Sequence, residues 1–147
     1  MRLGTLQNAM SARDRFHDAV KQALLKEQWI ITADPLMLKI EGVKFEIDLA
    51  AERILAAEKE GRKIAVEIKS FLSNSAIADF HLALGQFLNY RLALQMKDPD
   101  RTLYLALPVD TFADFFQERF VKAAIEIYQL KLVVYDPDRE AIVQWKN

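Results

Sequence analysis

The chain has 147 residues, a formal net charge of −1, and apolar residues at 52% of its positions. This length and apolar content suit one folded domain with a sizeable core. The near-neutral charge gives no support to tight, nonspecific binding of nucleic acid, although a local basic groove remains compatible with it. The absence of cysteine excludes disulfides and thiolate zinc sites, and it fits a reducing, cytoplasmic compartment.

The ends of the chain carry no sign of a membrane or export segment. No apolar run approaches the ~18 residues that a membrane span needs. The first ten residues lack the long apolar stretch of a secretory signal. We therefore expect residues 1–10 to form an N-terminal tail and residues 11–147 to form a single domain with no membrane contact.

The first half of that domain reads as one helix followed by strands. Apolar residues at helical spacing predict a helix over 13–28, with Ser11 as its cap. Two Glu-Gly turns, at 41–42 and 60–61, indicate hairpins. The predicted strands in this half are 29–32, 36–40, 43–49, 54–58 and 64–68.

The second half alternates helices and strands. The predicted elements are a helix over 75–96, a strand at 102–107, a helix over 111–128, and strands at 130–135 and 142–145. A helix between strands 64–68 and 102–107 implies a parallel crossover. The order α-β-β-β-α-β, followed by α-β-β, predicts an α/β fold with a mixed sheet flanked by helices.

The segment from Ile64 to Lys69 carries the clearest chemical signal. Alternation along a strand turns Ile64, Val66 and Ile68 to one face, and it turns Glu67 and Lys69 to the other. A solvated edge strand is the ordinary explanation of a lone Glu-x-Lys.

Asp48 changes that interpretation because it ends a strand of the hairpin that would pair with the Glu67 strand. The Asp48 and Glu67 carboxylates and the carbonyl of Ile68 would suit Mg²⁺ or Mn²⁺. Lys69 could orient an attacking water or stabilise charge on a phosphate.

Further polar residues lie on the following helix and elsewhere. Gln86 and Tyr90 stand at i and i+4, so both could approach a scissile phosphate or brace Lys69. Ordinary amphipathic packing is the alternative for that pair. An additional acidic ligand could come from the first helix (Asp14 or Asp18). Glu52 or Glu58 could be a further ligand, and His17 or His81 could form a His–carboxylate base, but we expect these four side chains to be solvated.

Taken together, Asp48, Glu67-Ile68-Lys69 and Gln86-x-x-x-Tyr90 resemble the PD-(D/E)XK nuclease superfamily, with the last motif similar to that of RecB-type nucleases. A closer resemblance covers residues 10–146 and points to the cyanobacterial XisH family. It is carried by residues 12–17, 48–53, 65–71, 84–86 and 90–91.

The XisH resemblance implies a restriction-endonuclease-like fold and a role in DNA rearrangement. Members of that family are named as controlling factors for excision of the fdxN element during heterocyst development, and they are commonly paired with a small XisI partner. We therefore expect an element-excision controlling factor that is a divalent-metal-dependent DNA endonuclease.

Two alternatives stay open. One is a non-catalytic factor that binds DNA or a site-specific recombinase through an XisI-like partner. The other is a carboxylate-pair hydrolase that acts on a different substrate. The high apolar content also predicts an exposed apolar patch that the partner or a second copy of the chain would cover.

Overall fold

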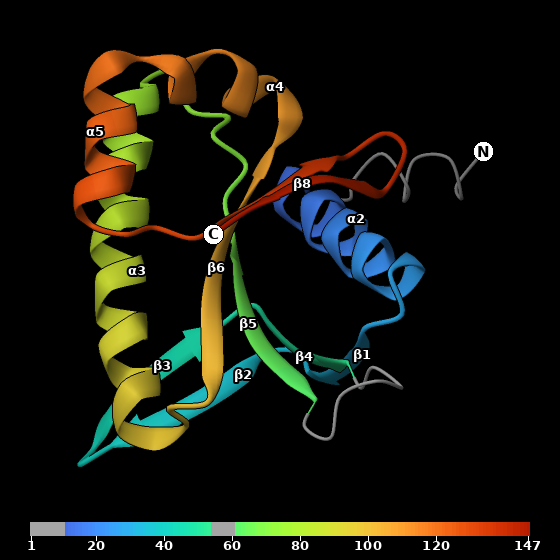
Figure 1. Ribbon diagram of the computed structural model, residues 1–147, viewed down its shortest axis with the longest axis vertical. Coiled ribbons are helices and arrows are strands. Elements are labelled where there is room, and N and C mark those ends of the chain that lie inside the picture. Colours follow the sequence, from blue (N-terminus) through green and yellow to red (C-terminus); the bar gives the residue numbers. More distant parts are fainter. Residues whose placement is uncertain (1–10, 54–60) are drawn as a thin grey trace.

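The computed structural model describes residues 11–53 and 61–147, which build a six-stranded sheet with helices on both faces (Figure 1). In spatial order the sheet contains β1 (Ile30–Ala33), β4 (Leu49–Arg53), β5 (Arg62–Ile68), β6 (Arg101–Pro108), β7 (Leu132–Asp136) and β8 (Ala141–Lys146). A separate two-stranded sheet contains β2 (Leu36–Ile40) and β3 (Val43–Ile47). The helices are α2 (Ala12–Lys26), α3 (Ala76–Lys97), α4 (Val109–Ala113), the 3₁₀ helix η1 (Phe115–Gln117) and α5 (Arg119–Ile127).

The predicted α/β class and mixed sheet are confirmed. Strands β5 and β6 are parallel, with α3 as their crossover helix, whereas β4 and β5 are antiparallel. Helix α2 covers one face of the sheet, and α3 and α5 lie on the other side (Figure 1). The predicted α-β-β-β-α-β order holds for the main sheet, because β2 and β3 leave it to form their own hairpin.

Two apolar cores, one on each face, follow from the alternation along the central strands. Ile64 and Val66 join the core beneath α2, which contains Phe16 and Leu24. Ala65 joins the core beneath α3, which contains Phe80. Because Glu67 follows Ala65 at a spacing of two, its side chain emerges on the α3 face.

Local turn and cap chemistry agrees with the sequence. The Ser11 hydroxyl accepts a hydrogen bond from the Asp14 backbone N–H at 3.1 Å, as a helix cap should. Between β2 and β3, Glu41 and Gly42 have φ angles of 47° and 89°. Two successive positive φ angles are the mark of a type I′ hairpin turn.

Two predicted elements differ from the structure, and a third lies outside the described residues. The predicted strand 43–49 is wrong, because it breaks at Asp48, where the chain passes from the small sheet to the main one. Residues 54–58 lie outside the described part of the chain, and the partner of β5 is β4, built on the alanines at 50 and 51. Small alanines have weak strand preference, so packing against β5 decides this pairing.

The predicted single helix over 111–128 is also wrong, because it is divided into α4, η1 and α5. The backbone leaves helical geometry at Asp114, with ψ −88°, and at Glu118, with ψ 138°. These breaks let Phe115 and Phe116 both turn toward Phe80, with ring centroids 6.0 and 5.8 Å from it. Aromatic packing therefore overrides the helical period of the sequence.

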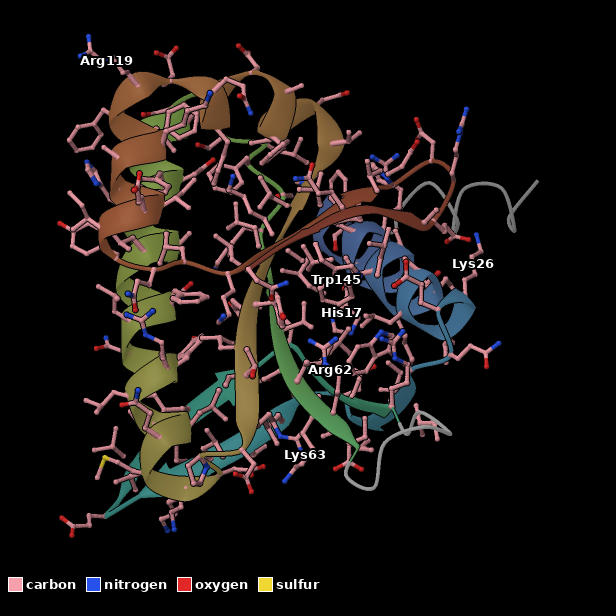
Figure 2. All side chains as sticks on the ribbon, viewed as in Figure 1. His17, Lys26, Arg62, Lys63, Arg119 and Trp145 are labelled. Carbon is pink, nitrogen blue, oxygen red and sulfur yellow. The ribbon has the colours of Figure 1, made fainter. Side chains whose placement is uncertain are left out.

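Helix α2 and the residues that follow it contact the far edge of the sheet at two points. Trp145 of β8 lies toward α2 in Figure 2, with its ring centroid 5.9 Å from that of Trp29. At the end of α2, Lys26 Nζ donates to the Arg139 carbonyl at 2.7 Å, close to the β7–β8 turn (Figure 2). Within the described ranges, no helix has both the length and the apolar character needed to cross a membrane.

Candidate functional site

Asp48 and Glu67 meet because β4 pairs with β5. Leu49 lies opposite Val66, so the residue before Leu49 faces the residue after Val66. Glu67 Oε1 accepts a hydrogen bond from the Asp48 backbone N–H at 3.3 Å. In return, Asp48 Oδ2 accepts from the Ile68 backbone N–H at 2.8 Å. Each carboxylate is thus oriented by the backbone of the other strand.

Glu67 is a buried acid with one nearby cation. Among the described residues, Glu67 is the one charged residue that is buried, with 5% of its surface exposed. Lys69 Nζ lies 3.4 Å from Glu67 Oε2. Burial and the neighbouring Asp48 carboxylate raise the pKa of Glu67 from 4.5 to about 7, against the opposing effect of Lys69. The raised pKa means that Glu67 binds a proton more readily than an ordinary glutamate does, and the same charge favours binding of another cation.

Gln86 and Tyr90 reach the same place from α3. Both line a cavity of about 330 Å³ together with Asp48, Glu67 and Lys69, which we call the carboxylate cavity. The Gln86 Oε1 atom is buried and has no hydrogen-bond partner among the described residues. The predicted residues thus surround one cavity, and the two helix residues face it together.

The Tyr90 hydroxyl lies in a negative field. Burial, and then the carboxylates of Glu67, Asp48 and Glu46, raise the pKa of the Tyr90 phenol. Its ring packs edge-on against Phe45 of β3, with centroids 6.3 Å apart. A phenol with a raised pKa keeps its proton at neutral pH, so Tyr90 can donate a hydrogen bond at the cavity.

The carbonyl of Ile68 is a third candidate oxygen donor. The N–H of Ile68 points to Asp48, and in a strand the N–H and C=O of one residue point to the same side. Ile68 also lines the carboxylate cavity. Two carboxylates and a carbonyl supply only oxygen donors, which is the donor set that Mg²⁺ and Mn²⁺ prefer. The residues therefore fit a hard divalent cation.

Sequence reasoning missed Glu46. It precedes Asp48 by two positions, lines the carboxylate cavity and is exposed at its edge. The period-two rule for strands could have found it, because residues i and i+2 share a face. The cavity therefore contains three carboxylates and one lysine.

His17 is half-buried and pairs with a carboxylate, whereas the sequence favours a solvated histidine there. Its Nε2 lies 2.8 Å from Asp34 Oδ1, and Lys21 Nζ donates to Asp34 Oδ2 at 3.0 Å. Despite its burial, hydrogen bonds and charge from Lys21 and His17 lower the pKa of Asp34. His17 also lines a cavity of about 200 Å³ with Asp48, Lys69 and Ser70, adjoining the carboxylate cavity.

The other candidate residues lie apart from the site. Asp14 and Asp18 are exposed on α2, and neither lines a cavity with Asp48. Across residues 11–53 and 61–147, no three histidine, aspartate or glutamate residues are grouped to hold a metal. An additional ligand from α2 is therefore not supported.

The last three candidates are placed by their surroundings. Glu52 lies 3.6 Å from Arg101, as a solvent-facing partner rather than a ligand. His81 is exposed on α3, as predicted. Glu58 lies outside the described residues.

Comparison with known proteins adds to this geometry. The family model described as XisH protein matches residues 10–143. The crystal structure of an XisH family protein from Nostoc punctiforme PCC 73102 matches this chain with a TM-score of 0.83, and the two sequences are 50% identical. That match covers 91% of this chain and 100% of the other.

A fdxN element excision controlling factor protein from Anabaena variabilis is 51% identical, with a TM-score of 0.82. The match covers 91% of this chain and 99% of that one. No curated protein matches. The family model and both structures agree, and the chain belongs to the XisH family.

Proposed function

We propose that the chain is an element-excision controlling factor that hydrolyses phosphodiester bonds of DNA with the help of Mg²⁺ or Mn²⁺. The observation that carries this proposal is the meeting of Asp48, Glu67 and Lys69 around one cavity. The similarity to a fdxN element excision controlling factor protein supports the biological setting. The restriction-endonuclease-like order of the same residues supports the chemistry.

Asp48, Glu67 and the carbonyl of Ile68 would hold the cation. Their charge favours this, because the neighbouring Asp48 carboxylate raises the pKa of the buried Glu67 despite the opposing effect of Lys69. When bound, a divalent cation polarises a phosphoryl oxygen and lowers the pKa of a coordinated water. A cation would also replace the proton that Glu67 otherwise tends to take up near neutral pH.

Lys69 would act on the attacking water and on developing charge. Its side chain is 22% exposed and its Nζ lies 3.4 Å from Glu67 Oε2, so the ammonium can reach both the cavity and an incoming phosphate. An ammonium held there can orient the water lone pair and stabilise negative charge on the phosphate.

Gln86 and Tyr90 would contact the substrate. The amide of Gln86 and the phenol of Tyr90 could each donate a hydrogen bond to a phosphate oxygen. Both come from one helix face, so they would position the phosphate as a unit.

A nicking assay tests this proposal. Supercoiled plasmid and single-stranded DNA would be incubated with the purified chain in Mg²⁺, Mn²⁺ or EDTA. The proposal requires metal-dependent cleavage that is lost in Lys69→Ala and retained in Lys97→Ala, an exposed lysine at the end of α3. Equal cleavage by wild type and Lys69→Ala would point to a contaminating nuclease or another site.

A non-catalytic excision factor is the second candidate. It is favoured by the net charge of −1 and by the lack of a third grouped ligand in the described residues. In this form the chain would bind DNA or a site-specific recombinase together with an XisI-like partner. Absence of cleavage under every metal condition, with and without that partner, would favour it over hydrolysis.

A further inference from the structure

A second, larger cavity lies on another part of the molecule. It measures about 990 Å³ and is bordered by α3, α5 and the end of β8, near the C terminus in Figure 1. It shares no lining residue with the carboxylate cavity. A smaller cavity of about 140 Å³ adjoins it and shares Arg91, Gln95, Gln129 and Lys131. We call the larger one the basic cavity.

The charged side chains around the basic cavity are predominantly cationic. They include Arg91, Lys122, Lys131 and Lys146, but only one acid, Glu126. These five side chains together carry a charge of +3, on a chain whose net charge is −1. Among the described residues, none of the three lysines has an ion-pair partner. Their charge is therefore available to a ligand.

Arg91 is held in place at the cavity wall. Its Nη1 donates to the carbonyls of Tyr128 at 2.9 Å and Gln129 at 3.0 Å, at the end of α5. Its guanidinium also lies over the Phe87 ring, 5.4 Å from the centroid. Both hydrogen bonds use one nitrogen, so the planar group keeps further donors for an anion. The entropy lost on binding is smaller for a side chain that is already fixed.

The remaining walls are suited to more than a bare anion. Apolar side chains come from Phe112, Ile125 and Leu130, and amides come from Gln95 and Gln117. A nucleobase has an apolar face and a hydrogen-bonding edge, which such walls can contact together. A volume near 1,000 Å³ lies at the upper end of the range of about 300–1,000 Å³ for small-ligand sites.

We propose that the basic cavity binds a phosphate-bearing nucleotide, either free or as one unit of a nucleic-acid strand. Lys122, Lys131 and Lys146 contact phosphate, Arg91 supplies a fixed planar donor, and the apolar and amide walls receive the base. The inference goes beyond the proposed hydrolysis and does not depend on it, because the two cavities have no residue in common.

Binding in EDTA tests the inference separately from any metal chemistry. A fluorescent single-stranded oligonucleotide and a fluorescent nucleoside triphosphate are titrated with the full chain at low salt. The first variant replaces Lys122, Lys131 and Lys146 with Gln. The matched control replaces Lys39, Lys44 and Lys97, three exposed lysines away from the cavity, with Gln. Arg91 is left intact because it also supports the end of α5.

The cavity variant should bind the oligonucleotide at least about tenfold more weakly than wild type. The slope of log binding constant against log salt concentration should become shallower by up to about 0.7 for each lysine removed, the value for a single strand. The control should stay within about twofold of wild type. Glu126→Gln should tighten binding, because it removes the acid of the cavity. Tight triphosphate binding identifies a free nucleotide as the source, whereas oligonucleotide binding alone identifies a strand.

Three results would overturn the inference. The first is the absence of binding of either ligand to the wild-type chain at low salt. The second is an equal loss in the cavity variant and the control, which would reduce the effect to overall charge. The third is that a poly-glutamate peptide of equal charge displaces the fluorescent oligonucleotide as effectively as the unlabelled oligonucleotide does. That result would assign the cavity to an acidic protein segment.

Discussion

The carboxylates of Asp48 and Glu67 are oriented reciprocally. The Asp48 N–H donates to Glu67 at 3.3 Å, and the N–H of the residue after Glu67 donates to Asp48 at 2.8 Å. Two acids that would repel each other are therefore held together by the register of β4 and β5. This arrangement places negative charge where a cation, and not a proton alone, can offset it.

Glu67→Gln should remove a pH-dependent loss of stability. Glu67 has a pKa of about 7 when folded and an ordinary value of 4.5, so the folded chain binds its proton more tightly than the unfolded chain. The stabilisation that comes from this tighter proton binding is fully present below about pH 4.5 and is lost as pH rises through about 7. The free energy of unfolding should fall by about 3 kcal/mol across this window in wild type, and by less in Glu67→Gln. Urea denaturation in EDTA at pH 5 and pH 8 measures the difference.

The exposed Glu126→Gln is the control for that experiment. It should show the same fall in stability with pH as wild type. Identical pH profiles for Glu67→Gln and wild type would show that Glu67 ionises normally in the folded chain.

Lys69→Ala and Glu67→Ala should separate metal binding from catalysis. Glu67 would hold the cation, whereas Lys69 repels it. Lys69→Ala should therefore keep or slightly tighten Mn²⁺ binding in calorimetry, while DNA nicking falls by ~10²–10³-fold. Glu67→Ala should lose both. Loss of metal binding in Lys69→Ala with a normal fold would contradict this division of roles.

Tyr90→Phe should lower activity without unfolding the protein. The change removes the hydroxyl near the carboxylates but keeps the ring that packs against Phe45. Nicking should drop by about tenfold, as expected for one lost hydrogen bond to a charged group. Tyr128→Phe, at an exposed position, is the control. Unchanged nicking in Tyr90→Phe would leave Tyr90 as a packing residue.

Arg101→Ala should destabilise the fold by about 3 kcal/mol. The Arg101 side chain is 8% exposed, and it donates to Asp98 at 2.9 Å and to the Ile64 carbonyl at 2.9 Å. Its loss removes this donor from the Ile64 carbonyl of β5 and from the Asp98 carboxylate. Arg139→Ala, at a side chain 84% exposed, should change stability by less than about 0.5 kcal/mol. Thermal and urea unfolding measure both variants, and equal effects would contradict the burial argument.

Elements with local signals could be predicted from the amino-acid sequence alone. Apolar alternation from Ile64 to Ile68 predicted both faces of β5, and the Glu41-Gly42 pair predicted its hairpin turn. The i, i+4 spacing of Gln86 and Tyr90 predicted that they would face one cavity together. Each inference depends only on the geometry of one strand, turn or helix.

The tertiary structure decided what depends on distant parts of the chain. The break at Asp48 arises because the chain changes sheets there, and no local pattern marks that passage. The division of helix 111–128 follows from the packing of Phe115 and Phe116 against Phe80. His17 joins the neighbourhood of Lys69 only because α2 lies on the sheet face beside it. Contacts between residues far apart in sequence select among conformations that local propensities leave nearly equal in free energy.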